Sequence, residues 1–323
     1  MLESLPVLIL NPHSRCNCRC TMCDIWKTTT AQEISVHDLK RQSESIERLQ
    51  VQWVVLSGGE ALMHSDLWSL IDLLRERQIR ITLLSSGLLL GRHAATLVKS
   101  VDDVIVSLDG PPAIHNSIRG VPGAFEVTAA GIASILERDP SFCISARSTV
   151  QRSNFRHLRE TVDTAQGLRL NSISFLAADV DSIAFARPNG WPVEKKTAVG
   201  LDTGEVAALE SEIEALISRD ECGGFICESP EKLRRIARHF RAVLNEIPAV
   251  APACNAPWKS AVVEADGSVR PCFFHGPIGN LNSGKPLDQI LNGPAAVAFR
   301  DSLNVATNPI CQKCVCALNW RPQ

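Results

Sequence analysis

Four cysteines lie within eight positions near the start of the chain, in the stretch "NPHSRCNCRCTMCDIW". Cys16, Cys20 and Cys23 have the spacing C-x3-C-x2-C, and Cys18 falls inside this motif. Three thiolates on one short loop match three corners of a [4Fe-4S] cube and leave the fourth iron open for chemistry, whereas four cysteine ligands make the closed electron-transfer arrangement. The spacing does not fit the C-x2-C pairs of zinc ribbons, although zinc is the alternative for this stretch. Cys18 is then the spare thiol.

A second group of cysteines lies near the C-terminus. Cys254 is followed after seventeen residues by Cys272, and Cys311 and Cys314 form a C-x2-C pair. These four thiolates would make a closed site, for which zinc is the alternative metal. Cys316 is the extra cysteine of this group. Two metal centres in two regions of the chain are the simplest interpretation.

Composition and charge narrow the function classes. The chain has 323 residues, of which twelve are cysteines, and a net charge of -2. Reducing compartments disfavour structural disulfides, so clustered cysteines indicate metal binding or catalysis. The charge gives no reason to expect nucleic-acid binding. No apolar stretch approaches the ~20 residues of a membrane span, and the start does not resemble a signal peptide. We therefore expect a cytoplasmic protein without a membrane or nucleic-acid partner.

Short apolar runs alternate with helical patterns through the first 180 residues. Runs rich in Val, Ile and Leu that end near Gly, Asn or Asp are typical of buried parallel strands. The expected strands are 6–11, 51–59, 80–87, 101–110, 142–150 and 172–180, and the expected helices are 37–50, 67–78, 91–100, 124–138 and 157–169. Strand-helix alternation predicts right-handed βαβ units and a parallel sheet. About six units are two short of a complete TIM barrel, so we expect a partial (β/α)6 barrel with a lateral opening.

The last part of the chain has a different pattern. A loop is expected over 181–202, two helices over 204–219 and 230–246, and a hairpin around Asp266-Gly267. Short helices are expected over 287–292 and 294–303. The predicted division is a barrel (1–200), linking helices (201–250) and a small α+β domain (251–323).

With its motif after the first strand of a six-unit βα chain, the sequence resembles the radical S-adenosylmethionine (SAM) superfamily. The resemblance implies that the cluster's open iron binds the amino and carboxylate groups of SAM, and that the reduced cluster cleaves SAM to a 5'-deoxyadenosyl radical. One difference is Met22, where the family usually has an aromatic residue before the third cysteine.

Other motifs fall at the carboxyl ends of the expected strands, where ligands bind in parallel α/β folds. "SGGE" matches the family's GGE motif, which implies contact with the methionine amino group, and "SSG" ends the third strand. An arginine in an apolar strand needs a partner, and a cofactor carboxylate would supply one. The resemblance implies these cofactor-binding residues: Gly58, Gly59, Glu60, Ser85, Ser107 and Arg147.

The C-terminal pattern "C…W…DGSVRPCFFHGPIGNL…LDQIL…FR…CQKC" resembles the twitch domain, the short form of the SPASM extension. The twitch form holds one auxiliary [4Fe-4S] cluster, whereas the full form has seven cysteines and two clusters. With five cysteines in this region, one auxiliary cluster is expected, held by Cys254, Cys272, Cys311 and Cys314.

The expected function is a radical oxidoreductase or epimerase that abstracts hydrogen from a small molecule, such as a sugar, an aminocyclitol or another natural product. Peptide-modifying relatives often carry an additional N-terminal leader-binding domain, and the sequence begins at the first strand, which favours a small molecule. A peptide or protein maturase is one alternative, and a non-enzymatic iron-sulfur electron carrier is another. The enzyme would need an external reductant such as flavodoxin or ferredoxin.

Three residues are candidates for the chemistry itself. The chain has no tyrosine, so cysteine is the obvious hydrogen donor, and Cys316 is spare beside the auxiliary ligands. Asp179, after the last strand, and His275, after Cys272, are candidates for substrate or proton-transfer groups. A capping aspartate and a surface histidine are the alternatives. The other spare thiols are Cys143, Cys222 and Cys227.

Overall fold

One nine-stranded sheet runs through the chain in the order β6-β5-β4-β3-β2-β1-β7-β8-β9. The structure is a computed structural model that describes residues 1–219 and 224–321. Strands β1 to β7 are parallel along this order, and β8 and β9 are antiparallel. The partial parallel barrel predicted from the sequence is confirmed. The strands are Val7–Leu10 (β1), Trp53–Leu56 (β2), Arg80–Ser85 (β3), Asp103–Ser107 (β4), Cys143–Val150 (β5), Ser172–Ala177 (β6), Ser260–Val263 (β7), Ser268–Arg270 (β8) and Gly279–Asn280 (β9).

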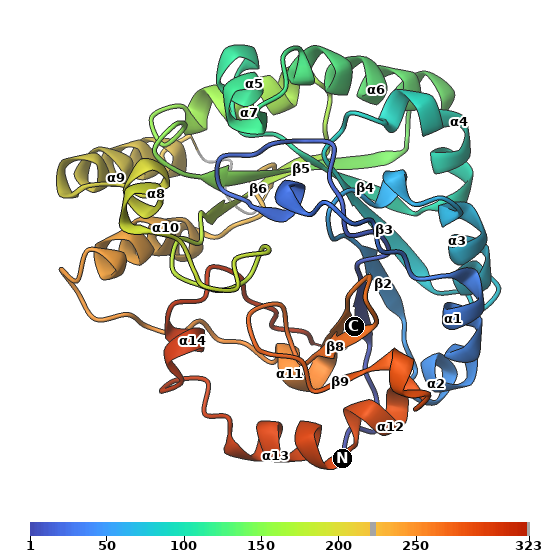
Figure 1. Cartoon of the computed structure of the whole chain (residues 1–323). Helices are drawn as coiled ribbons and strands as arrows, with labels where there is room; N and C mark the ends of the chain where they lie inside the picture. The colour runs from blue at the N-terminus through green and yellow to red at the C-terminus, as the bar shows by residue number, and fades with distance from the viewer. Residues whose placement is uncertain (220–223, 322–323) are drawn as a thin grey trace.

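Helices cover the outer face of the curved sheet (Figure 1). The α-helices of the barrel part are Val36–Arg41 (α1), Ser43–Arg48 (α2), Leu67–Arg75 (α3), Leu90–Ser100 (α4), Pro112–Arg119 (α5), Ala124–Arg138 (α6), Leu158–Gly167 (α7), Val193–Val199 (α8), Thr203–Ile217 (α9) and Pro230–Val243 (α10). The C-terminal part adds Ala256–Lys259 (α11), Leu287–Leu291 (α12), Pro294–Ser302 (α13) and Pro309–Gln312 (α14). Short 3-10 turns are Ile25–Lys27 (η1), Ala61–Met63 (η2) and Leu281–Ser283 (η3).

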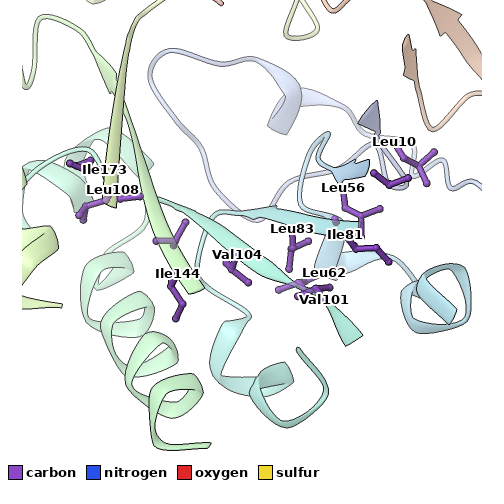
Figure 2. Close-up of a cluster of buried hydrophobic side chains, with 14 of the residues drawn as sticks. Leu10, Leu56, Leu62, Ile81, Leu83, Val101, Val104, Leu108, Ile144 and Ile173 are labelled. Atoms are coloured by element: carbon purple, nitrogen blue, oxygen red, sulfur yellow. The ribbon is translucent and has the colours of Figure 1, made fainter. Parts of the chain in front are cut away.

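Strand residues alternate between a fully buried outer face and a partly accessible inner face. Val104 and Ile144 point toward the helices and are 0% exposed (Figure 2). Their neighbours Ile105, Ser107 and Arg147 are only partly buried. Because successive side chains of a strand point to opposite faces, the partly buried set lines the inside of the barrel. The interior is therefore accessible, and polar side chains reach it from the strands.

Helices α5 and α8 lie where the sequence pattern did not predict them, and so do the four-residue helices α11 and α14. Helix α5 follows β4, and helix α8 lies within the segment that was expected to be a loop. Both begin directly after a proline-containing turn, with Pro112 as the first residue of α5 and Pro192 as the N-cap of α8. Proline presets the backbone for a helix start, and the two helices, with eight and seven residues, are shorter than the helices that the sequence pattern predicted in the barrel.

The C-terminal part continues the barrel sheet. Strand β7 pairs in parallel with β1, with Val7 opposite Ser260 and Leu10 opposite Val263. The β7-β8 hairpin turns at Asp266 and Gly267, as the sequence predicted. The three-part domain division stays a prediction, although its last part shares a sheet with its first.

The chain returns to the barrel at its C-terminal end. The ring of Trp320 lies 6.3 Å from that of Trp53 on β2, and Asn255 exchanges hydrogen bonds with the backbone of Trp320. In Figure 1 this end of the chain lies inside the ring of elements. Among the described residues, no helix is both long and apolar enough to span a membrane.

Candidate active site

The N-terminal cysteines lie together on the loop after β1. Cys18 is 1% exposed and lies between Cys16 and Cys20 in the loop. The interaction of its thiol with these two thiols raises the pKa of Cys18, lowers that of Cys16 and lowers that of Cys20 to about 6. Burial raises the pKa of Cys23 to about 12. The middle thiol therefore keeps its proton, and its two neighbours are favoured as thiolates, the form that binds metal.

A buried arginine contacts this loop. Arg119 Nη1 donates to Cys20 Sγ at 3.6 Å, and Nη2 lies 2.5 Å from Asp109 Oδ2. The sequence analysis included neither residue in the site. A charged residue at the end of an apolar strand was the available signal for Asp109.

The two glycines of the GGE motif pack directly against the cysteine loop. A Cβ on Gly59 would lie 2.1 Å from the carbonyl oxygen of Arg15, and Gly58 has a φ of +101°. The amide of Gly59 donates to His13 O at 3.3 Å, and that of Glu60 donates to Arg15 O at 2.9 Å. The glycines are thus required for close approach to the loop that carries Cys16.

Glu60 is fully buried and holds the end of β3. Its carboxylate accepts hydrogen bonds from Ser85 Oγ at 3.1 Å and from the Ser86 amide at 2.7 Å. Burial raises its pKa, which these bonds partly oppose. Ser86 Oγ in turn donates to Asn17 Oδ1 at 2.9 Å. A chain of hydrogen bonds therefore links Glu60, the β3 end and the cysteine loop, and Glu60 is positioned by protein groups.

Ser107 and Arg147 are opposite each other on β4 and β5 and face the interior. Among the residues that the structure describes, the buried Nε of Arg147 has no hydrogen-bond partner, and neither has the Nδ2 of Asn17 or the Nε2 of Gln151. Buried donors are normally satisfied. These unpaired donors, from the cysteine loop and β5, fit a ligand with carboxylate or hydroxyl oxygens, as SAM has.

The C-terminal cysteines form a second cluster of thiols. Burial raises the pKa of Cys272, of Cys314, and of Cys311 to about 11, and each is raised further by the charge of Cys254 and other cysteines nearby. A bound metal reverses this tendency, because coordinated thiols are deprotonated. The four predicted ligands thus act on one another electrostatically, although they come from separate segments, and their role as ligands stays a prediction.

Cys316 lies within the electrostatic range of the barrel residues. Its side chain is exposed, yet burial raises its pKa, and Arg147 and Asp179 are among the charges that act on it, with Arg235. Arg147 lies on β5, so the C-terminal tail brings this thiol toward the barrel strands. Cys314 Sγ donates to the Cys316 carbonyl oxygen at 2.6 Å, which fixes the two cysteines relative to each other.

Asp179 is part of a buried ion pair. Arg187 Nη2 lies 2.9 Å from Asp179 Oδ2, and the two side chains are 0% and 3% exposed. The guanidinium also lies 4.2 Å from the ring centroid of Trp191, whose Nε1 donates to Asp24 beside Cys23. These contacts hold the 178–192 loop, and they occupy the carboxylate that was predicted to act on substrate.

The 178–192 loop also contacts the second cysteine group. Phe185 packs on Phe273, next to Cys272, with ring centroids 4.8 Å apart. Asp181 pairs with Lys313, between Cys311 and Cys314, at 3.1 Å. Met22, at the position usually aromatic in the family, packs near Trp191. This one loop therefore touches the segments that carry both cysteine groups.

His275 lies beside the auxiliary cysteines. Its Nε2 is 3.5 Å from Cys311 Sγ, and its ring packs on Phe299. The structure thus places it against a predicted ligand. Of the other spare thiols, Cys143 and Cys227 are exposed, and Cys222 lies outside the described residues.

Both donor sets consist of cysteine thiols. Thiolate-only sets select zinc or iron-sulfur clusters. In the part of the chain that the structure describes, no three His, Cys, Asp or Glu side chains converge around a single ion. A cube places a different iron at each thiolate, so this result concerns single-ion sites alone. Three thiols, a buried cation and unpaired donors toward the interior fit a cluster with bound SAM.

Comparisons with known proteins agree with this geometry. The sequence model of the radical SAM superfamily matches residues 10–165, and that of the SPASM iron-sulfur cluster-binding domain matches residues 254–315. An AdoMet-dependent heme synthase of Methanosarcina barkeri is 30% identical over 47% of this chain and 45% of its own length. The subtilosin biosynthesis protein AlbA of Bacillus subtilis is 25% identical over 80% of this chain and 52% of its own. The chain thus spans about half the length of these relatives.

A solved structure shows the same fold over nearly the whole chain. Streptococcus suis SuiB, bound to S-adenosylmethionine, aligns with a TM-score of 0.69 and 15% identity, covering 98% of this chain and 74% of SuiB. Together with the two family matches, the cysteine loop and the glycine contacts behind it lead to one conclusion. The chain belongs to the radical SAM superfamily, whose cofactors are a [4Fe-4S] cluster and SAM, and it carries a C-terminal SPASM iron-sulfur domain.

Proposed function

We propose that this chain is a radical SAM enzyme that modifies a peptide or protein substrate. The observation that supports this most is the match to AlbA, which extends over 80% of the chain. AlbA is a biosynthesis protein for the bacteriocin subtilosin, and a bacteriocin is an antibacterial peptide or protein. This support favours a peptide over the small molecule expected from the sequence.

At the N-terminal site, different residues of the chain have different roles in this proposal. Cys16, Cys20 and Cys23 hold the SAM-binding cluster, and Cys18 stays protonated between two of them. When bound, the cluster and SAM supply reductive cleavage to the 5'-deoxyadenosyl radical. Arg147, with its unpaired Nε, meets the carboxylate of SAM.

The remaining cofactor contacts come from the strand ends. Ser107 is placed beside Arg147 to meet the ribose. Gly58 and Gly59 bring the β2 end against the cysteine loop. Glu60 fixes Ser85 and Ser86 and so acts on SAM binding through the β3 end.

The second site would hold one auxiliary cluster on Cys254, Cys272, Cys311 and Cys314. In this proposal Cys316 returns a hydrogen atom to a substrate radical, which its proximity to the charges of Arg147 and Asp179 supports. For Asp179 and His275 the contacts favour positioning roles, since Asp179 holds the 178–192 loop through Arg187 and His275 packs on Cys311.

A tetrapyrrole is the second candidate substrate. The heme synthase match favours it, with 30% identity, although the match covers 47% of the chain. A test is anaerobic incubation of reconstituted enzyme with SAM and dithionite, with either peptides encoded by neighbouring reading frames or iron coproporphyrin III.

The peptide proposal expects 5'-deoxyadenosine together with a mass change in one peptide. Turnover of the porphyrin with every peptide unchanged would replace it with the tetrapyrrole. Running the productive reaction in deuterated water then separates the outcomes: deuterium uptake at carbon indicates a thiol donor, and loss of two hydrogens indicates oxidation.

A further inference from the structure

A buried ion pair lies directly behind Cys20. Arg119 Nη2 and Asp109 Oδ2 are 2.5 Å apart, and the two side chains are 8% and 0% exposed. The same guanidinium donates through Nη1 to Cys20 Sγ at 3.6 Å. One buried cation therefore connects a carboxylate to a proposed cluster ligand.

Backbone hydrogen bonds between the cysteine loop and the end of α5 hold Arg119 in contact with Cys20. The amide of Arg19 donates to Arg119 O at 2.8 Å, and that of Thr21 donates to Ile118 O at 3.0 Å. Helix α5 ends at Gly120, where φ is +63° and a Cβ would lie 2.7 Å from Arg19 O. The helix end and the cysteine loop are thus in direct backbone contact, and Arg119 is held beside Cys20.

Asp109, the other partner of the ion pair, is also held by hydrogen bonds. Its Oδ1 accepts from the Thr149 amide at 2.9 Å, and its carbonyl oxygen accepts from Asn154 Nδ2 at 2.9 Å. Burial raises the pKa of Asp109, while Arg119 opposes that effect. The carboxylate therefore has little freedom to move away from the guanidinium.

Such a pair is difficult to explain by stability alone. Removing two charges from water is costly, and apolar replacements of buried ion pairs are often neutral or stabilising. The pair does have a clear electrostatic effect on its neighbour. Reduction of a cluster adds one negative charge, and cluster potentials depend on local charge and on hydrogen bonds to the sulfurs. In a low-dielectric interior these effects are strong.

We propose that Arg119 and Asp109 set the reduction potential of the N-terminal cluster, with Arg119 raising it and Asp109 lowering it. Arg119 acts through the sulfur of Cys20 and is a positioning residue. The proposal rests on the proposed function, because it needs Cys20 to be a cluster ligand. The two effects oppose each other. Each residue alone shifts the potential in its own direction, and the two charges of the pair sum to zero.

The test is a redox titration of the N-terminal cluster, followed by electron paramagnetic resonance, in full-length holoprotein. The variants are Arg119→Met, Asp109→Asn and the double variant, with Arg119→Lys as the charge-conserving control. Arg119→Met should lower the ratio of reduced to oxidised cluster at the wild-type midpoint potential about tenfold. This corresponds to a shift of the midpoint by about 59 mV in the negative direction for one electron. Asp109→Asn should shift the midpoint in the positive direction. The double variant should return toward wild type, and Arg119→Lys should lie closer to wild type than Arg119→Met.

The auxiliary cluster serves as the internal control, and the triple variant of Cys16, Cys20 and Cys23 to Ala gives its separate spectrum. Its midpoint should stay unchanged in every variant. The proposal would be overturned if Arg119→Met and Asp109→Asn shifted the midpoint in the same direction, if neither shifted it, or if both clusters shifted equally. A general loosening of the structure has no reason to shift the midpoint in opposite directions in the two variants. If Arg119→Met loads no N-terminal cluster, Asp109→Asn and Arg119→Lys still decide.

Iron analysis of the wild type separates this test from the proposed function. A wild-type protein without iron on the N-terminal loop would overturn the proposed function and this inference together. A protein with both clusters but unmoved potentials would overturn the inference alone.

Discussion

The carbonyl oxygen of Arg15 occupies the space in which a side chain on Gly59 would begin, 2.1 Å from an ideal Cβ position. Arg15 directly precedes Cys16, and the amide of Glu60 donates to the same oxygen. The GGE motif therefore supports the cysteine loop through backbone contact, in addition to any contact with SAM.

Gly59→Ala should displace the cysteine loop and prevent assembly of the N-terminal cluster. The expected result of anaerobic reconstitution is about four irons where the wild type holds about eight. Gly167→Ala is the matched control, because no atom of the described, non-neighbouring residues lies within 4 Å of its added methyl group. Iron and sulfide analysis measures the result, and a full complement of iron in Gly59→Ala would show that the loop can move aside.

Arg147→Ala and Glu60→Ala should weaken SAM binding while both clusters persist. Arg147 would lose a charge-assisted contact worth roughly 1.5–3 kcal/mol, so the Kd should rise about tenfold or more. Glu60→Ala removes the acceptor for Ser85 and the Ser86 amide, and should act by loosening the β3 end. Arg152→Ala, whose partner is Glu205 on the protein surface, is the control. Unchanged affinity in either variant would remove that residue from the site.

The Ala variants of Cys314 and Cys316 should lose different properties of the protein. Cys314→Ala should lose the auxiliary iron and destabilise the C-terminal part, since metal binding and folding are coupled there. Cys316→Ala should keep all iron and still cleave SAM. If the reaction is an epimerisation, this variant should stall with an unquenched substrate radical, visible by electron paramagnetic resonance. The opposite pattern of iron loss would make Cys316 the ligand.

His115 should make the fold sensitive to acid. Burial lowers its pKa to about 3, with Arg119 adding to the effect, and its Nδ1 accepts from the Asp109 amide at 3.2 Å. The pKa of His115 in the folded protein lies below the unfolded value near 6.5. The stabilisation of the fold by neutral His115 is therefore fully present above pH 6.5 and is lost as the pH falls toward 3. At pH 5 the loss is about 2 kcal/mol.

The matched variant for this test is His115→Asn, whose side-chain oxygen replaces the lost acceptor. Denaturant unfolding at pH 7 and pH 5 should show a larger decrease in the free energy of unfolding for wild type than for the variant. Equal decreases would mean that His115 is not the group that titrates.

Features encoded in short stretches of sequence were predictable. Apolar runs gave the six barrel strands, and Asp266-Gly267 gave the β7-β8 hairpin, because both depend on neighbouring residues. The cysteine loop was found because its spacing alone carries the chemistry. Helix α5 was missed because its eight residues span little more than two turns, a short segment for recognising a helical pattern.

Long-range contacts could not be predicted in the same way. Arg119 and Cys20 are 99 positions apart, and only the packing of α5 on the cysteine loop brings them together. Asp179 was expected to face the substrate, and its pairing with Arg187 depends on how the 178–192 loop folds. A sequence pattern shows which groups are available, whereas the tertiary structure decides which of them neutralise each other.

The pairing of β7 with β1 has a consequence for how the protein is made. During synthesis, this edge of β1 stays unpaired until β7, which follows more than two hundred residues later in the chain, has been made. Its residues Val7 to Leu10 are apolar, and such edges promote aggregation of incomplete chains. The segment that completes the sheet is also the one that carries the auxiliary cysteines. Iron supply during translation would therefore influence how many chains reach the folded state, before any catalysis begins.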